Sequence, residues 1–103
     1  MSTKSKIVLI TGATAGIGRF TALHLAKLGH HVIASGRKLD ELAKLEAEAR
    51  VTNVRLDTVA LDVTSATSIA AAVAAVDTLT DGKGPDVLVN NAGFGILDRK
   101  SVV

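Results

Sequence analysis

The residues Thr11-Gly12-Ala13-Thr14-Ala15-Gly16-Ile17-Gly18 place three glycines between a short apolar run and a helix-like segment, and this arrangement indicates how the chain folds. The run before it, Ile7-Val8-Leu9-Ile10, reads as a buried parallel strand. A chain that leaves a strand and starts a helix within a few residues needs backbone conformations that only glycine adopts without strain. The free amides and the positive dipole end of such a helix attract an anion. The stretch therefore predicts a phosphate-binding turn.

Each glycine of this loop has its own expected role. Gly12 supplies the turn, Gly16 lets the backbone approach a pyrophosphate, and Gly18 lets the helix pack close to the sheet. The spacing is G-x-x-x-G-x-G rather than the commoner G-x-G-x-x-G, and the triplet alone also fits a turn without a ligand. No Gly-Lys-Ser/Thr follows, so the phosphate loop of nucleotide hydrolases is excluded. The strand and helix around the loop favour dinucleotide binding.

Strands and helices are expected to alternate along the whole chain. The expected strands are 6–11, 31–35, a stretch within 54–63 that ends near Asp62, and 86–90. Helices are expected at 17–28 and 39–50, and a third follows a cap at Thr64 or Ser65. The order βαβαβαβ, with connections long enough for right-handed crossovers, predicts a parallel sheet in an α/β fold.

Apolar residues at intervals of three and four indicate each of the three helices. The recurring residues are Ile17, Thr21, Leu25 and Leu28 in the first segment; Leu39, Leu42, Leu45 and Ala49 in the second; and Ile69, Val73, Val76 and Thr80 in the third. The three histidines, His24, His30 and His31, have no carboxylate or further histidine at a metal-ligand spacing, so we expect structural roles for them and no metal site.

Composition narrows the class of protein. The 103 residues are enough for one domain, and 48% of them are hydrophobic while only 2% are aromatic. The net charge of +2 is small and dispersed, which argues against a nucleic-acid partner. Cysteine is absent, which excludes disulfides and thiolate metal sites. With no apolar run long enough for a signal or a membrane span, we expect a cytoplasmic protein without a membrane partner.

Three motifs in order resemble those of the short-chain dehydrogenase/reductase family. They are the glycine loop, Asp62-Val63 after the third strand, and Asn90-Asn91-Ala92-Gly93 after the fourth. The resemblance implies a three-layer, doubly wound Rossmann-type sheet with strand order 3-2-1-4, truncated after the fourth strand. Two helices should then cover one face of the sheet and the third helix the other. We expect a NAD(P)-binding half-domain over residues 1–95 and a tail without a clear pattern over 96–103.

The end of the second strand favours NADP(H) over NAD(H). An acidic residue at this position bonds the ribose hydroxyls of NAD, whereas an arginine pairs with the 2′-phosphate of NADP. Here the expected position falls at Gly36, no carboxylate is present, and Arg37 follows, with Ser35 and Lys38 near enough to assist. A solvated arginine without a ligand is the simpler alternative for Arg37.

The resemblance also assigns Asp62 and Val63 to the adenine edge, and Asn90, Ala92 and Gly93 to the segment that flanks the adenosine ribose. For Asp62, a helix-capping or loop carboxylate is the alternative. The full expected cofactor-binding set is Gly12, Thr14, Gly16, Ile17, Gly18, Ser35, Arg37, Asp62, Val63, Asn90, Ala92 and Gly93. Arg19 could also reach a phosphate, although an exposed helical arginine explains it equally simply.

The resemblance implies hydride transfer between the nicotinamide and a carbonyl or alcohol substrate, with a tyrosine as general acid/base beside a lysine. The sequence contains no tyrosine, so no residue is assigned a catalytic role and we expect this chain to be inactive by itself. A non-enzymatic dinucleotide-binding or sensing module, or a nonfunctional truncated product, fits the same residues. An open edge at the fourth strand predicts marginal stability or self-association through exposed apolar surface.

Overall fold

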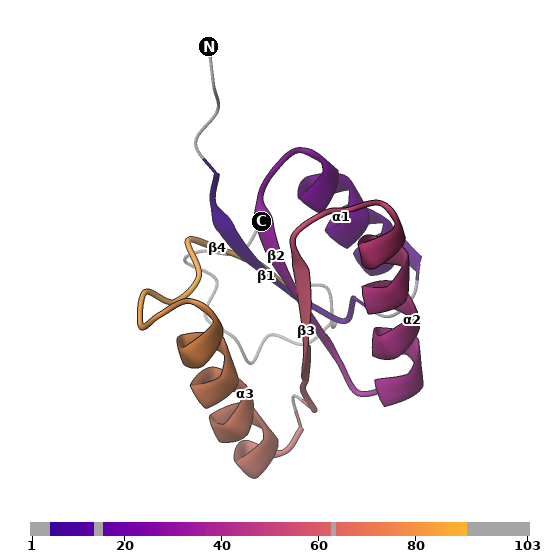
Figure 1. Ribbon diagram of the computed structural model, residues 1–103. Helices are drawn as coiled ribbons and strands as arrows, with labels where there is room; N and C mark the ends of the chain where they lie inside the picture. Colours follow the sequence, from indigo (N-terminus) through magenta and orange to yellow (C-terminus); the bar gives the residue numbers. More distant parts are fainter. Residues whose placement is uncertain (1–4, 14–15, 63, 91–103) are drawn as a thin grey trace.

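The computed structural model describes residues 5–13, 16–62 and 64–90, with Asn90 described by its backbone alone. Strands and helices alternate through these ranges as the sequence predicts (Figure 1). In chain order they are β1 (Ile7–Thr11), α1 (Gly16–Lys27), β2 (His31–Gly36), α2 (Leu39–Val51), β3 (Leu56–Ala60), α3 (Ala66–Leu79) and β4 (Val87–Asn90).

The four strands form one parallel sheet in the order β3-β2-β1-β4, which confirms the predicted topology. β1 lies inside the sheet and pairs with β2 through Val8↔Val32 and with β4 through Val8↔Val87. Because all strands are parallel, the loops that follow them leave from the same edge of the sheet. The order of the strands reverses beside β1, and ligands of such sheets bind at this switch point.

Helices cover both faces of the sheet, with α1 and α2 on one side and α3 on the other (Figure 1). Alternate residues of each strand point to opposite faces, so Val32 and Ala34 pack under α1 and α2, whereas Ile33 packs under α3. Among the described residues, the face under α1 and α2 holds the larger of the two clusters of buried side chains. The predicted division of the helices, two on one face and one on the other, is confirmed.

Apart from Leu25, which is partly buried against the core, the residues whose spacing indicates α1 are not those that this helix buries. Gly18, Ala22 and Ala26 face the sheet, while Ile17 is 76% exposed and Leu28 is 59% exposed. Small side chains let the helix axis approach the sheet closely, and the larger apolar residues then lie on the flank of the helix. Gly18 is thus buried against the sheet, as its predicted packing role requires.

The caps and histidines take structural roles. Ser65 is the N-cap of α3, and its hydroxyl accepts a hydrogen bond of 3.2 Å from the Ser68 amide. Buried His31 on β2 lies 2.7 Å from the Asp57 carboxylate on β3, and His30 accepts a hydrogen bond from the Lys6 amide. Within the described ranges, no group of His, Asp or Glu side chains could hold a metal ion.

Candidate functional site

The glycine loop joins the carboxyl end of β1 to the first turn of α1. Gly12 has φ 64° and Gly16 has φ 58°, both in the left-handed region that side-chain-bearing residues rarely adopt. A Cβ added at Gly16 would meet no atom within 4 Å, so the side of Gly16 on which a side chain would project is open space. The conformation of the backbone therefore requires glycine here, and room for a ligand remains beside it.

Backbone hydrogen bonds fasten this loop to the neighbouring strand ends. The Ala13 amide donates to the Ser35 carbonyl at 3.0 Å, and the Leu61 amide donates to the Gly36 carbonyl at 2.8 Å. The Ser35 hydroxyl is buried and donates to the Ile10 carbonyl at 2.8 Å. These hydrogen bonds link the ends of β1, β2 and β3 into one rim at the carboxyl edge of the sheet.

The turn after β2 carries two exposed cations. Arg37 and Lys38 follow the buried Gly36 directly, and both side chains are exposed to solvent. Lys38 is the N-cap residue of α2, and its carbonyl accepts a hydrogen bond from the Leu42 amide. The geometry brings positive charge to the rim without an acidic residue in the turn itself. Ser35 differs from Arg37 and Lys38, because its hydroxyl is buried and donates a hydrogen bond to the Ile10 carbonyl.

Asp62 lies on the same rim, at the turn after β3. Its carboxylate oxygen Oδ1 accepts two hydrogen bonds, one from the Thr64 hydroxyl at 2.6 Å and one from the Thr64 amide at 3.0 Å. These two bonds, together with the positive charge of Arg37, lower the pKa of the Asp62 carboxyl against the opposing effect of desolvation. The ends of β2 and β3 thus place a guanidinium and an ionised carboxylate within electrostatic range of each other.

Thr64 and Ser68 also belong to this rim, although the sequence predicts Thr64 only as an alternative helix cap and assigns Ser68 no role. The Ser68 hydroxyl, in the first turn of α3, accepts a hydrogen bond of 2.8 Å from the Asp62 backbone amide. The backbone of Asp62 is thus held by α3, and its carboxylate is held by Thr64, which lies just before α3. The spacing Asp-x-Thr is typical of a turn in which an aspartate accepts from the residue two positions later. This pattern could have identified Thr64 in the sequence.

The Thr64 hydroxyl supplies a direct test of this arrangement. In the Thr64→Val variant the carboxyl of Asp62 loses its shortest hydrogen bond, so its pKa is expected to rise towards the ordinary value. A carboxyl group whose pKa is lower in the folded state stabilises the fold at pH values above its unfolded-state pKa. This contribution disappears as the pH falls through the folded-state pKa. The variant should therefore lose stability at neutral pH and little in acid.

Carboxyl titration by NMR measures this shift, with Thr67→Val on α3 as the control for the loss of a threonine hydroxyl. An unchanged Asp62 titration in the Thr64→Val variant would contradict the assignment of Thr64 as the orienting residue.

The turn after β4 is described only as far as the backbone of Asn90, which pairs with Thr11 across the switch point of the sheet. Four members of the predicted set, Thr14, Val63, Ala92 and Gly93, lie outside the described residues. Gly12, Gly16, Ile17, Gly18, Ser35, Arg37, Asp62 and Asn90 all belong to the carboxyl edge of the sheet or to the first turn of α1. Their contacts with a cofactor stay predictions.

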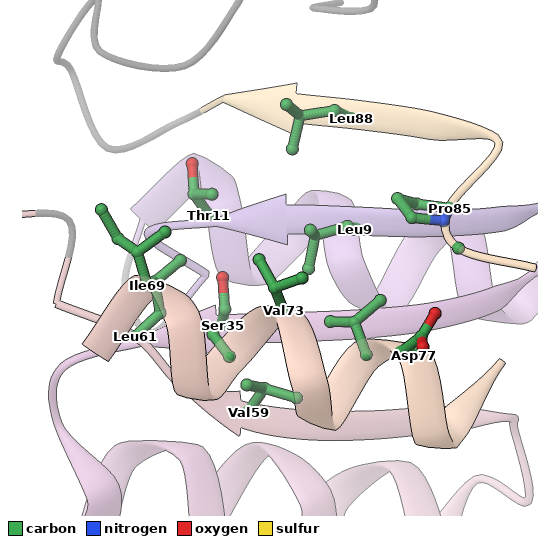
Figure 2. Close-up of a pocket in the computed structure, with 13 residues that line it drawn as sticks. Leu9, Thr11, Ser35, Val59, Leu61, Ile69, Val73, Asp77, Pro85 and Leu88 are labelled. Atoms are coloured by element: carbon green, nitrogen blue, oxygen red, sulfur yellow. The ribbon is translucent and has the colours of Figure 1, made fainter. Parts of the chain in front are cut away.

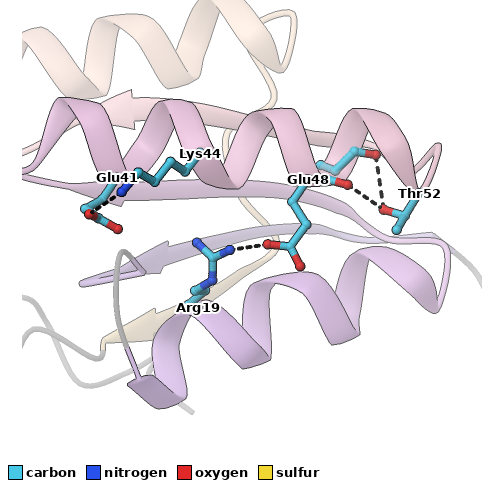
Figure 3. Close-up of polar contacts among 6 residues, drawn as sticks. Arg19, Glu41, Lys44, Glu48 and Thr52 are labelled. Atoms are coloured by element: carbon cyan, nitrogen blue, oxygen red, sulfur yellow. Dashed lines mark hydrogen bonds and ion pairs between the residues drawn. The ribbon is translucent and has the colours of Figure 1, made fainter.

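Arg19 is engaged elsewhere. Its guanidinium forms an ion pair with Glu48 of α2, across the two helices that cover the first face (Figure 3). The same close-up shows the Lys44–Glu41 pair and the Thr52 hydroxyl that bonds the carbonyl of Glu48. This contact favours the structural interpretation of Arg19 over a role at a phosphate.

A parallel sheet in the order β3-β2-β1-β4 with a glycine loop at its switch point defines a Rossmann-like α/β protein. The family model described as short chain dehydrogenase matches residues 6–102. The chain belongs to this family, as the three motifs predict.

Two curated relatives illustrate the match. An uncharacterized oxidoreductase of Myxococcus xanthus is 41% identical over 90 residues, which cover 87% of this chain and 35% of the relative. An NADPH-dependent pterin aldehyde reductase of Arabidopsis thaliana is also 41% identical over 90 residues, covering 86% of this chain and 36% of the relative. The chain thus spans about a third of the length of these relatives.

Solved structures agree with this assignment. An actinorhodin polyketide ketoreductase with NADPH superposes with a TM-score of 0.76 at 40% identity, covering 88% of this chain and 34% of that chain. The L-sorbose reductase of Gluconobacter frateurii, complexed with NADPH and L-sorbose, gives a TM-score of 0.76 at 37% identity with the same coverage.

None of the helices in the described ranges combines the length and apolar character needed to span a bilayer.

Proposed function

We propose that this chain is the NADP(H)-binding part of a short-chain oxidoreductase. The observation that carries the proposal is the rim of the sheet, where the glycine loop, Arg37 and Asp62 come from three separate turns and lie along one edge. The pyrophosphate would lie at Gly16 and the first turn of α1, where the backbone is exposed and a side chain would have open space.

Arg37 is the residue that would hold the 2′-phosphate. Its guanidinium is exposed and permanently charged, and the turn around it has no carboxylate to bond ribose hydroxyls instead. Lys38 would add charge, while Ser35 would contribute through the rigid turn that its buried hydroxyl holds. Asp62, ionised and oriented by Thr64, is suited to accept hydrogen bonds from the adenine edge. The NADPH-bound neighbours and the NADPH-dependent relative support this choice.

When bound, a nicotinamide dinucleotide supplies the hydride for the reduction of a carbonyl or accepts one from an alcohol. The residues of this chain would bind and orient it through the loop and the rim. The 103 residues contain no tyrosine to act as the proton donor that the family resemblance implies, so no residue here is assigned to proton transfer. We therefore expect binding without turnover from this chain alone.

A binding titration with NADP(H) and NAD(H) tests the proposal, and Arg37→Glu is the informative variant. We expect its affinity for NADP(H) to fall about 100-fold while NAD(H) affinity stays equal or improves, because the carboxylate repels the 2′-phosphate. Arg50→Glu, the same charge change at the far end of α2, is the matched control and should leave both affinities unchanged. An unchanged cofactor preference in Arg37→Glu would rule out the assignment.

A non-enzymatic dinucleotide-binding or sensing module is the second candidate, because the glycine loop and the rim would bind the same dinucleotide without any residue that transfers a proton. The two candidates differ in the polypeptide that accompanies this chain in the cell. A Tyr-x-x-x-Lys sequence in the remainder of the coding sequence would support the oxidoreductase, whereas a coding sequence without one would support the module.

A further inference from the structure

The strand ends follow one another along the rim in the covalent order of a dinucleotide. The glycine loop after β1, Arg37 after β2 and Asp62 after β3 are neighbours in the sheet order, and backbone hydrogen bonds join their turns. This inference rests on the proposed function, in which the pyrophosphate lies at the glycine loop and the 2′-phosphate at Arg37. The base attached to that ribose then comes to the turn after β3.

The carboxylate of Asp62 is held in this turn by one of its two oxygens. The Thr64 hydroxyl at 2.6 Å and the Thr64 amide at 3.0 Å both donate to Oδ1. Within the described part of the chain, no donor bonds the second oxygen, Oδ2. Two hydrogen bonds to the same oxygen oppose rotation of the carboxylate. Thr64 therefore fixes one oxygen and leaves the other for a ligand.

The position of this turn is set by the core beneath it. Leu61, directly before Asp62, and Ile69, directly after Ser68, line the same apolar pocket between α3 and the sheet (Figure 2). The Ser68 hydroxyl accepts from the Asp62 amide at 2.8 Å, and the Ser68 amide in turn donates to the Ser65 hydroxyl. The backbone of Asp62 is thus anchored to α3, while the orientation of its carboxylate depends on Thr64.

The protonation state of Asp62 limits what the remaining oxygen can bind. The bonds from Thr64, with a smaller contribution from the charge of Arg37, lower the pKa of the Asp62 carboxyl. An ionised carboxylate accepts hydrogen bonds and donates none. A purine with an amino group at C6 offers a donor to it, whereas a purine with a carbonyl at C6 offers only an acceptor oxygen there. The two oxygens would repel each other.

We propose that Thr64 is a positioning residue for base recognition, which holds Oδ1 of Asp62 so that Oδ2 accepts from the 6-amino group of the base. Thr64 touches neither the base nor the phosphates in this arrangement and acts through Asp62 alone. The chain then discriminates between 6-aminopurine and 6-oxopurine dinucleotides, and the strength of this discrimination depends on the Thr64 hydroxyl.

Titration with two reduced dinucleotides tests the proposal on the full 103-residue chain. The probes are NADPH and reduced nicotinamide hypoxanthine dinucleotide phosphate, which differ in the base and share the pyrophosphate and the 2′-phosphate. We expect the unmodified chain to bind NADPH about tenfold more tightly, because the 6-oxo base leaves Asp62 facing an acceptor. Thr64→Val should lower NADPH affinity about tenfold and leave the affinity for the hypoxanthine dinucleotide unchanged.

Two control variants accompany Thr64→Val. Thr64→Ser keeps the hydroxyl and should retain the preference for NADPH. Thr67→Val removes a threonine hydroxyl from an exposed position of α3 and should change neither affinity. The hypoxanthine dinucleotide also reports on folding, because a Thr64→Val chain that failed to fold would bind neither probe.

Two results would overturn the role of Thr64. The unmodified chain would bind both dinucleotides equally, or Thr64→Val would weaken both to the same extent, which would assign the threonine a structural role only. Arg37→Glu separates this inference from the proposed function, because both probes carry the 2′-phosphate and should weaken equally. If Arg37→Glu weakened neither probe, the assignment of Arg37 would fail while the comparison of the two bases still tested Thr64.

Discussion

Leu45→Ala is expected to lower the free energy of unfolding by about 2–5 kcal/mol, which is a large share of the stability of a domain this small. Leu45 lies on the inner side of α2 and is completely buried in the core of the first face. The shortened side chain leaves a cavity between the helix and β2 and β3, which the surrounding backbone can fill only in part. Urea unfolding followed by circular dichroism measures the loss.

Leu39→Ala is the matched control on the same helix. Leu39 is 66% exposed at the first position of α2, and the same substitution there removes little buried surface. We expect a change of less than about 0.5 kcal/mol. Equal losses in the two variants would contradict the burial that the structure assigns to them.

Gly16→Val is expected to weaken NADP(H) binding by about 100-fold or more. The backbone of Gly16 has φ 58°, and a β-branched residue cannot hold this conformation without strain. The added side chain would also occupy the open space beside the loop, which the proposed pyrophosphate needs. Isothermal titration with NADP(H) measures the loss of affinity.

Gly82→Val separates strain from the loss of a ligand site. Gly82 has φ 82° and likewise has no atom within 4 Å of an added Cβ, but it lies in the loop between α3 and β4, at the opposite edge of the sheet. Its substitution should destabilise the fold to a similar extent and leave cofactor affinity unchanged. If both variants lost affinity equally, the effect at Gly16 would come from folding and not from the loop.

The order of elements and the topology of the sheet were predictable from the sequence because each depends on local patterns. β-branched runs end at glycines or polar turns, and the crossover rule then limits how the strands are arranged. The cap of α3 was predicted to within one residue, at Thr64 or Ser65, and the structure places it at Ser65.

The buried faces of the helices were harder to predict. In α1 the sheet selects Gly18 and Ala22, although Ile17 and Leu28 carry the stronger apolar pattern. Hydrophobic spacing shows that a helix has an apolar stripe, but not whether the sheet or a neighbouring helix covers it. In α3 the same uncertainty concerns Val73, which is 62% exposed although it belongs to the apolar spacing of its helix.

The candidate site was predictable in its position and only partly in its contacts. The glycine loop, Arg37 and Asp62 follow three strands of a parallel sheet, so the sequence alone places them at one edge. The Thr64 bonds to Asp62 are local to one turn and follow from the Asp-x-Thr spacing, whereas the bond from the buried Ser35 hydroxyl to the Ile10 carbonyl depends on how neighbouring strands approach each other. That approach is a property of the packed sheet and has no single sequence motif.

The position of β1 inside the sheet has a consequence for how the chain folds during synthesis. Its pairing with β2 joins residues 24 apart, whereas its pairing with β4 joins residues 79 apart, as in Ile7↔His31 and Val8↔Val87. The ribosome therefore releases β1, α1 and β2 well before β4 emerges, and one edge of β1 waits unpaired through that interval. This long sequence separation raises the contact order, so the pairing of β1 with β4 is expected to form more slowly than its pairing with β2.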